Sequence, residues 1–204
     1  MKRLFLSMLL ALPLTIAAQD NSWEKIEQEP TQNVNRDAKY LEANAVPEVD
    51  GVVCWETTVK APGKSASQIY DILLTQMEKM TKESNQFENS IVAIKNADKK
   101  EIGGVYHEWL VFKNAALSLD RTKLNFQLIV ECSDGEANVK MTRITYDYDL
   151  NRKPEHYKAE EWITDKYCVN KKHTKLLPIS GKFRRKTIDR KNFIFNKFQT
   201  LLNN

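Results

Sequence analysis

Leu124-Asn125-Phe126-Gln127-Leu128-Ile129-Val130-Glu131-Cys132 is the clearest strand in the chain and decides its fold. Apolar residues occupy every even position and alternate with mostly polar ones, a period of two that predicts a β-strand with one buried and one solvated face. Asp134-Gly135 follows, and Asp-Gly between two alternating runs is the strongest short hairpin signal. An antiparallel hairpin is therefore expected here.

This hairpin belongs to a longer run of predicted strands from Ser90 to Tyr148. The four strands are expected at Ser90–Lys95, Ile102–Lys113, Leu124–Cys132 and Glu136–Tyr148. Gly103-Gly104 indicates a bulge or a close backbone approach. Both faces of the second strand are largely apolar, which favours a strand in the middle of the sheet with both faces covered. The apolar positions of the fourth strand shift phase, which predicts a bulge near Thr142–Arg143.

One strand and one helix precede this run. The strand is predicted at Val52–Lys60 and ends at Pro62-Gly63. Ser65 and Gln68 then form a capping box that starts a helix. The helix has one apolar stripe at spacings of three and four residues, made of Ile69, Ile72, Leu73, Met77 and Met80.

The C-terminal part is predicted as a loop at Asn151–Lys158, a short helix at Ala159–Val169 and a last helix that starts at Thr187. A short helical turn is also expected near Asp37–Leu41, ahead of the first strand. The complete order is strand, helix, four strands, helix. This order predicts an α+β fold, a curved antiparallel sheet with helices packed on one face.

The first 18 residues have the three parts of a secretory signal peptide. Lys2 and Arg3 are the basic part, Leu4–Leu14 the apolar part and Thr15–Ala18 the small-residue end. The apolar part is too short to span a bilayer. We expect cleavage near Ala18, a flexible leader at 19–36, and one domain at 37–204 with an insertion at 151–180. The mature protein is expected to be secreted, in the periplasm or at the cell envelope, and not to span the membrane.

Charge is distributed unevenly along the chain. Residues 19–150 contain 15 basic and 22 acidic side chains, a net charge of −7, whereas residues 151–204 contain 14 and 5, a net charge of +9. One interpretation is that the basic part packs over the acidic body. The other is a surface for an anionic partner. Nucleic acid is not an expected partner, because a secreted protein meets little of it.

Three cysteines make an odd number for an oxidising compartment. Cys132 lies on the apolar face of its strand and Cys54 on the opposite face of the first strand, so a bridge between them would cross the sheet, which disulfide geometry forbids. Cys168 can pair with either of them. We favour three free cysteines that act as small buried hydrophobic residues.

The sequence contains no established catalytic or metal-binding motif, so no catalytic residue, metal or cofactor is predicted. The three histidines lie in unrelated segments, and we expect His107 to be buried and hydrogen-bonded. Asp147 and Asp149 form either a calcium or carboxylate pair or, as we favour, a solvated strand end. Cys168, beside Lys166 and basic neighbours, is a weak candidate for a nucleophile.

The candidate ligand-binding residues are Lys182, Arg184, Arg185 and Lys186, four cations around Phe183. Arginine offers a planar fork for phosphate or carboxylate, so this basic segment (Lys182–Lys186) can clamp an anion. The alternative is structural: Phe183 anchors the segment and the cations pair with the acidic body. Cations at a helix start are disfavoured by the helix dipole, which indicates an acidic partner, internal or external.

Several segments together resemble a secreted family of unknown function from Bacteroides-type bacteria. The segments are Lys39-Tyr40-Leu41, Ala45–Gly51, Ala159–Asp165 and Ser180–Asp189, the last being the most specific. The resemblance covers residues 37–204 and implies a fold like that of the TATA-binding protein (TBP-like). It implies no catalytic residue, and it suggests that the segments around Trp162 and Lys182–Asp189 share one role, structural or functional.

Three functions follow from these observations. The first is a non-enzymatic binding module of the envelope, for an anionic or amphipathic ligand, that uses the basic segment or the uncovered face of the sheet. The second is a structural or protein-interaction module of the cell envelope. The third is an enzyme of unrecognised type. A shared fold does not itself assign a function.

Overall fold

The computed structural model of this 204-residue chain describes residues 37–115, 118–150 and 152–204. The expected signal peptide (1–18) and leader (19–36) lie outside these residues. Within the described ranges, no helix is both long and apolar enough to cross a membrane.

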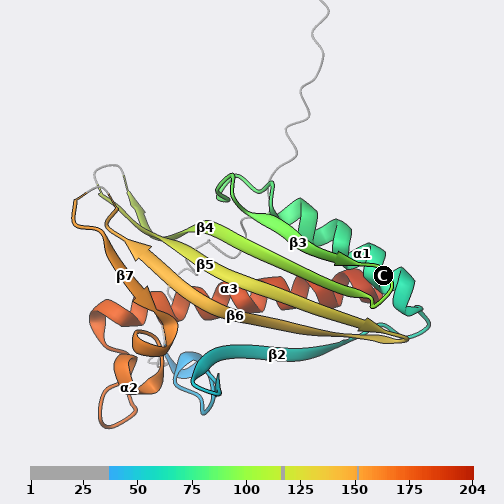
Figure 1. The fold of residues 1–204 in the computed structure, drawn as a ribbon. Coiled ribbons are helices and arrows are strands. Elements are labelled where there is room, and N and C mark those ends of the chain that lie inside the picture. Colours follow the sequence, from blue (N-terminus) through green and yellow to red (C-terminus); the bar gives the residue numbers. More distant parts are fainter. Residues whose placement is uncertain (1–36, 116–117, 151) are drawn as a thin grey trace, which may run out of the picture.

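The described residues form a seven-stranded antiparallel sheet (Figure 1). Its strands are β1 (Glu48–Val49), β2 (Val52–Lys60), β3 (Ile91–Asn96), β4 (Glu101–Ala115), β5 (Ser118–Ser133), β6 (Glu136–Tyr148) and β7 (Glu155–Lys158). The order across the sheet is β1-β2-β6-β5-β4-β3, and β7 also pairs with β6. The predicted strand Leu124–Cys132 is thus part of β5, which lies between the two long strands β4 and β6.

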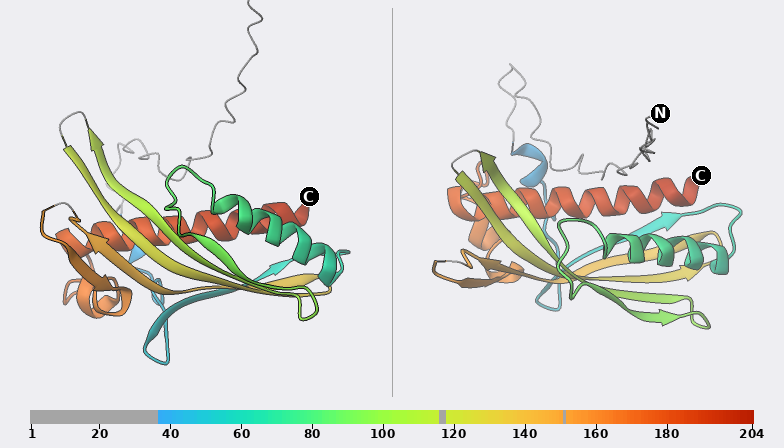
Figure 2. Two further views of the ribbon diagram at one scale, coloured as in Figure 1. Left: turned by 45° about the horizontal axis from the view of Figure 1, so that its top comes forward. Right: turned by 90° about the horizontal axis from the view of Figure 1, so that it is seen from above.

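The long helices α1 (Ala66–Met80) and α3 (Pro178–Asn203) lie on one side of the sheet (Figures 1 and 2). A single turn, α2 (Asp165–Cys168), and 3-10 turns at Ala38–Tyr40 and Ala159–Glu161 complete this layer. The alternate side chains of β5 are buried on the helix side, namely Leu124, Phe126, Leu128, Val130 and Cys132. The α+β prediction, with helices on one face of an antiparallel sheet, is confirmed. We call the other side of the sheet, formed by the outward side chains of β4, β5, β6 and β7, the open face.

Helix α1 begins as the sequence predicts. Ser65 Oγ accepts a hydrogen bond from the Gln68 backbone N–H, and Gln68 Oε1 accepts one from the Ser65 backbone N–H at 2.8 Å. This capping box satisfies N–H groups that the first turn of a helix leaves free. The apolar stripe of α1 then packs on the sheet, with Ile69, Leu73, Met77 and Met80 buried.

Strand β6 changes its edge partner at a bulge. Residues 136–142 pair with β2, whereas residues 145–148 pair with β7. Arg143, between the two parts, has a φ of 52°, and the pairing with β5 shifts register opposite it. The predicted bulge near Thr142–Arg143 is confirmed. Because the bulge lets β7 pair with the far end of β6, it also brings His156 to the open face.

The predicted start of the last helix at Thr187 is wrong. Helix α3 begins at Pro178, with Leu177 at the N-cap position. Proline at the first helical position has no N–H to leave unpaired, so Pro178 is a signal for the start of a helix. Gly181 also obscured the helix, but a Cβ there would lie 2.9 Å from Leu176 Cβ. The glycine therefore permits close packing inside the helix rather than ending it.

Three further expectations are corrected. The predicted loop at Asn151–Lys158 contains β7, and the predicted helix at Ala159–Val169 is a 3-10 turn followed by the single turn of α2. Strand β4 is not covered on both faces, because the helices lie on one side only. Its outward side chains are half-buried, namely Val105, His107, Trp109 and Val111. The apolar outward face of β4 is therefore a feature of the open face.

A fully buried ion pair ties α3 to β4. Arg190 donates from Nε to Glu108 Oε1 at 2.7 Å and from Nη2 to Glu108 Oε2 at 2.8 Å, and both side chains are 0% exposed. Nη2 also donates to Glu83 at 2.9 Å, and Gln86 donates to Glu108. Burial raises the pKa of Glu108, whereas the charge and hydrogen bonds of Arg190 act in the opposite direction. We take the bidentate geometry as that of a carboxylate paired with a guanidinium.

Arg190→Met removes one partner of this pair and leaves Glu108 as a buried charge. We expect it to lower the free energy of unfolding by about 3–5 kcal/mol, measured by chemical denaturation. The double variant Arg190→Met/Glu108→Leu is expected to recover most of this loss, because it buries no charge. As a control, Lys95→Met breaks the exposed pair with Glu78 and is expected to cost at most about 1 kcal/mol. A loss below 1 kcal/mol for Arg190→Met would contradict the assignment.

Candidate functional site

The structure places the basic segment inside the first turns of α3, where its side chains turn toward the protein. Arg184 is 0% exposed. It donates from Nε to the Tyr40 carbonyl at 2.8 Å and from Nη1 to the Ile163 carbonyl at 2.9 Å. Nη1 also lies 2.7 Å from Asp165 Oδ1. Arg184 therefore joins three segments that are distant in the sequence.

The neighbouring cations of this segment also meet acidic groups. Lys182 Nζ lies 2.7 Å from Asp120 Oδ2 and 2.9 Å from the Tyr148 hydroxyl oxygen. Arg185 lies 3.4 Å from Asp37. Lys186 is half-buried on the same turns. The contacts of Lys182, Arg184 and Arg185 correspond to the alternative interpretation, in which the cations pair with the protein's own carboxylates.

Phe183, at the centre of the segment, is fully buried in an aromatic cluster. Its ring centre lies 4.6 Å from that of Phe112 and 5.1 Å from that of Tyr146, and it also meets Tyr148, Tyr157 and Trp162. Tyr157 and Trp162 stack in parallel with ring centres 3.8 Å apart. The two segments of the resemblance, around Trp162 and around Phe183, therefore share one structural role: they close the β7 end of the sheet against α3.

A chain of polar side chains crosses the open face from β4 to β7. His107 Nδ1 lies 2.7 Å from Asn125 Oδ1, and the Asn125 amide donates to Asp147 Oδ2 at 3.0 Å. Asp147 Oδ1 in turn lies 2.7 Å from His156 Nδ1. His107 is hydrogen-bonded as expected, but it is half-buried on the open face rather than in the core. Two histidines from unrelated segments thus meet one network.

Asp147 is held as a carboxylate in this network. Partial burial works to raise its pKa, but the hydrogen bonds from His156 and Asn125 outweigh burial and lower the pKa below the ordinary value. Asp149, the other aspartate of the predicted strand end, pairs with Arg152 instead. The described residues contain no cluster of three or more potential metal ligands.

Beside this network, cations stack on aromatic rings. The Arg121 guanidinium carbon lies 3.6 Å from the centre of the Trp109 ring. Lys123 Nζ lies 4.9 Å from the centre of the Phe87 ring, whose centre is 4.8 Å from that of Trp109. Within the described part of the chain, neither Arg121 nor Lys123 has a hydrogen bond or ion pair from its side chain. We call these four residues the aromatic–cation cluster.

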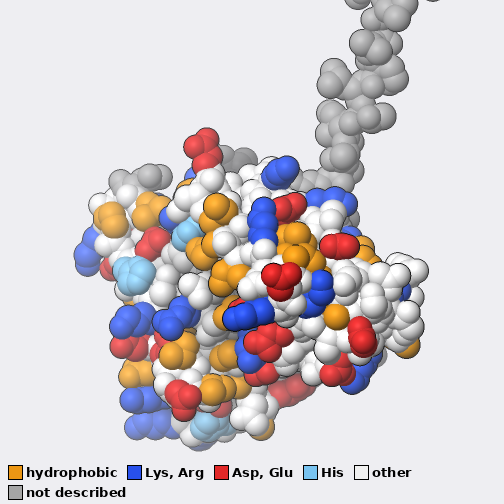
Figure 3. All heavy atoms as spheres, turned by 45° about the vertical axis from the view of Figure 1, so that its right-hand side comes forward, with side chains coloured by type: hydrophobic (Ala, Val, Ile, Leu, Met, Phe, Trp, Pro, Cys, Tyr) orange, Lys and Arg blue, Asp and Glu red, His pale blue; other side chains and the backbone are white. Residues whose placement is uncertain are grey.

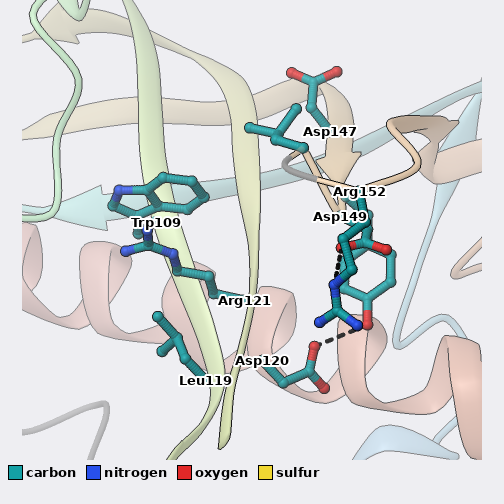
Figure 4. Close-up of a pocket in the computed structure, with 9 residues that line it drawn as sticks. Trp109, Leu119, Asp120, Arg121, Asp147, Asp149 and Arg152 are labelled. Carbon is teal, nitrogen blue, oxygen red and sulfur yellow. Dashed lines mark hydrogen bonds and ion pairs between the residues drawn. The ribbon is translucent and has the colours of Figure 1, made fainter.

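The cluster borders a cavity of about 130 Å³ at the ends of β4, β5 and β6 (Figure 4). Figure 4 shows the Arg121 side chain beside the Trp109 ring, with Asp120 turned toward the Tyr148 hydroxyl and Arg152 toward Asp149. The cavity is lined by Trp109, Leu119, Asp120, Arg121, Asp147, Tyr148, Asp149, Leu150 and Arg152. Apolar side chains thus alternate with groups that can hydrogen-bond or carry charge, in a hollow smaller than the range of about 300–1,000 Å³ typical of small-molecule sites.

The three cysteines are free, as the sequence analysis favoured. Burial raises the pKa of the Cys168 thiol and raises that of Cys132 to about 11. Both thiols are therefore protonated at neutral pH, whereas a nucleophilic cysteine needs a lowered pKa.

Sequence reasoning did not find the aromatic–cation cluster. The alternation of β4 and β5 places Trp109, Arg121 and Lys123 on the same face, which is a detectable signal. The contact itself depends on the pairing register, in which Trp109 lies opposite Lys123 and Val111 opposite Arg121. Only with that register do these side chains become neighbours.

Comparisons with known proteins give a family and a fold. Residues 55–147 match the family model DUF4468, described as a domain of unknown function with a TBP-like fold. The crystal structure of a DUF4468 family protein from Bacteroides ovatus is similar, with 42% sequence identity and a TM-score of 0.75, covering 82% of this chain and 95% of that one.

A TBP-like protein from Parabacteroides distasonis shares the fold, with 20% identity and a TM-score of 0.63, covering 78% of this chain and 97% of that one. No curated protein matches the chain. The family and the TBP-like fold that the resemblance implied are confirmed. The chain belongs to the DUF4468 family, a domain of unknown function with a TBP-like fold.

Proposed function

We propose that this protein is a secreted, non-enzymatic binding module that holds an anionic or amphipathic ligand on the open face of its sheet. The observation that carries the proposal is the stack of Arg121 on Trp109 at 3.6 Å, beside a cavity and without a carboxylate partner among the described residues. The secreted location is supported by the signal-peptide pattern of residues 1–18.

The stack suits a ligand that is both charged and apolar. A guanidinium on an aromatic face keeps its N–H donors in its own plane, where they can reach a carboxylate or phosphate. Lys123 adds a second cation nearby, and Leu119 and Leu150 offer exposed apolar surface at the cavity. An anion bound there would displace water from donors that have no protein acceptor.

A ligand role for Lys182, Arg184, Arg185 and Lys186 stays a prediction. The internal ion pairs of three of them favour a structural role, because an external anion would have to compete with Asp120, Asp165 and Asp37. For this reason we place the ligand at Arg121 rather than at the basic segment.

The non-enzymatic character is also a proposal. The thiols of Cys132 and Cys168 are not activated, and within residues 37–115, 118–150 and 152–204 no serine or cysteine hydrogen-bonds to the pair of His156 and Asp147. An acid–base pair with no serine or cysteine nucleophile beside it among the described residues supports binding better than catalysis.

The alternative is a protein-interaction module of the cell envelope. It is favoured by apolar side chains exposed where α2 meets the start of α3, namely Tyr167, Leu177 and Ile179, of which Ile179 is 66% exposed. By contrast, the surface turned to the viewer in Figure 3 mixes hydrophobic, basic and acidic side chains and shows no broad apolar area. If this alternative holds, Ile179→Ser would weaken a protein complex and leave ligand binding unchanged. Size-exclusion chromatography would measure the first effect and a ligand titration the second.

The main test is a thermal-shift screen of the mature protein against anionic envelope compounds, with fatty acids, lipid phosphates and acidic glycans as probes. A ligand at 100 times its dissociation constant is expected to add about 2.7 kcal/mol to the free energy of unfolding. Arg121→Gln and Trp109→Leu are expected to abolish this gain. Lys99→Gln, which removes an exposed cation from the β3–β4 turn, is the matched control and should keep it. A gain that persists in Arg121→Gln would contradict the proposed site.

Arg184→Met separates the structural from the ligand-binding interpretation of the basic segment. It leaves two buried carbonyls without donors, so we expect a loss of about 1–3 kcal/mol in the free energy of unfolding. Arg185→Gln, at a half-exposed pair, should cost less than about 1 kcal/mol. Both variants should still be stabilised by the ligand. If Arg185→Gln keeps the free energy of unfolding of the free protein but is no longer stabilised by the ligand, the ligand site would lie at the basic segment instead.

A further inference from the structure

A second cavity lies on the helix side of the sheet, away from the open face. It has a volume of about 280 Å³ and opens between α3, β2 and the turn at residues 42–45. It is lined by Lys39, Glu42, Ala43, Asn44, Ala45, Trp55, Ile188, Lys191 and Asn192. Trp55 and Ile188 are almost fully buried and form an apolar floor.

Lys191 is the unusual group in this lining. It is half-buried, and among the described residues its ammonium group has neither a hydrogen bond nor an ion pair. Its Nζ lies 6.0 Å from the centre of the Trp55 ring and 5.6 Å from that of Phe195. Burial lowers the pKa of Lys191, as expected for a cation taken out of water without a counter-charge.

The nearby carboxylates are placed so that they do not neutralise Lys191. Asp189, on the same helix, accepts hydrogen bonds from the Tyr40 hydroxyl at 2.9 and 3.0 Å and lies 3.3 Å from Lys39. Glu42 is the one acidic residue in the lining, and it is exposed. Because Lys39 is already paired with Asp189, Lys191 is the cation of this lining that has no ion pair among the described residues.

The polar groups of the lining can satisfy a bound anion. Besides the Lys191 ammonium group, the lining contains the side-chain amides of Asn44 and Asn192, which can donate hydrogen bonds. The indole N–H of Trp55 is already used, because it donates to the Ala45 carbonyl at 2.9 Å. Trp55 therefore offers its ring rather than its N–H, and the hydrogen bond fixes the turn against β2. The cavity thus combines one cation, Lys191, with the apolar surface of Trp55 and Ile188.

We propose that this cavity binds a small amphipathic carboxylate, with its charge at Lys191 and its apolar part against Trp55 and Ile188. The volume lies just below the range of about 300–1,000 Å³ typical of small-molecule sites, which limits the enclosed part of the ligand to a compact group. This site is independent of the proposed site at Arg121, because the two lie on opposite sides of the sheet.

The test titrates the protein with hexanoate and follows binding by calorimetry and by Trp fluorescence. We expect hexanoate to bind with a dissociation constant tighter than about 1 mM. The neutral hexanamide should bind at least tenfold more weakly. Dodecanoate distinguishes the source of the carboxylate: tighter binding than hexanoate indicates a fatty acid whose tail leaves the cavity, and equal or weaker binding indicates a free small acid. Inorganic phosphate serves as the comparison anion.

Lys191→Met is the decisive variant, because it removes the charge and keeps a side chain of similar length. It should abolish hexanoate binding and, in the free protein, raise the melting temperature, since the variant no longer holds a half-buried charge without a counter-ion. Lys197→Met, on the same helix but outside the lining, is the matched control and should change neither property. Lys191→Arg should retain binding.

Two results would overturn the proposal. One is hexanoate binding that Lys191→Met leaves unchanged. The other is failure of hexanoate and dodecanoate to bind the wild-type protein, or binding of phosphate in preference to both. Arg121→Gln should leave hexanoate binding intact. This variant therefore tests the site at Lys191 separately from the proposed site on the open face.

Discussion

The fold depends on the burial of alternate side chains of β5 beneath α1 and α3. Because β5 pairs with β4 along one edge and with β6 along the other, its register fixes which side chains of both neighbours face the helices. A shift by one residue would bring Asn125 and Gln127 into the core and move Phe126 and Leu128 into water. The bulge of β6 at Arg143 is compatible with this constraint, because it changes the phase of β6 only where β7 replaces β2 as the edge partner.

Helix α3 must also bury two arginines together with its apolar residues. Arg184 and Arg190 are both fully buried, and each has a carboxylate oxygen within hydrogen-bond distance. Four of the carboxylates that α3 reaches come from the acidic body of the chain, namely Asp37, Glu83, Glu108 and Asp120. This pairing accounts for much of the charge asymmetry in the sequence. Three cations of α3 thus pair with carboxylates of the acidic body, and these pairs help to set the position of α3 along the sheet.

Local patterns predicted the parts of the fold that local chemistry controls. The alternation of Leu124–Cys132, the capping box of Ser65 and the phase change near Arg143 each act within a few residues, and each is found in the structure. The start of α3 was missed because Gly181 and the cations after it are poor helix signals by themselves. Their helical conformation is stabilised by tertiary contacts, of Phe183 with five aromatic rings and of Arg184 with distant carbonyls. The same applies to Arg121, Trp109 and Lys191, whose environments depend on elements distant in sequence.

The environments of the arginines in this protein support the proposed location of the ligand. A cation that is fully buried must have a counter-charge, because the free-energy cost of desolvation is otherwise too large. Arg184 and Arg190 obey this rule, because each is paired with at least one carboxylate. Arg121 lies on the open face, where water reduces the cost of desolvation and the Trp109 ring holds the guanidinium in place. Its donors are therefore positioned but not engaged, and this combination allows an anion to bind without first breaking an internal ion pair.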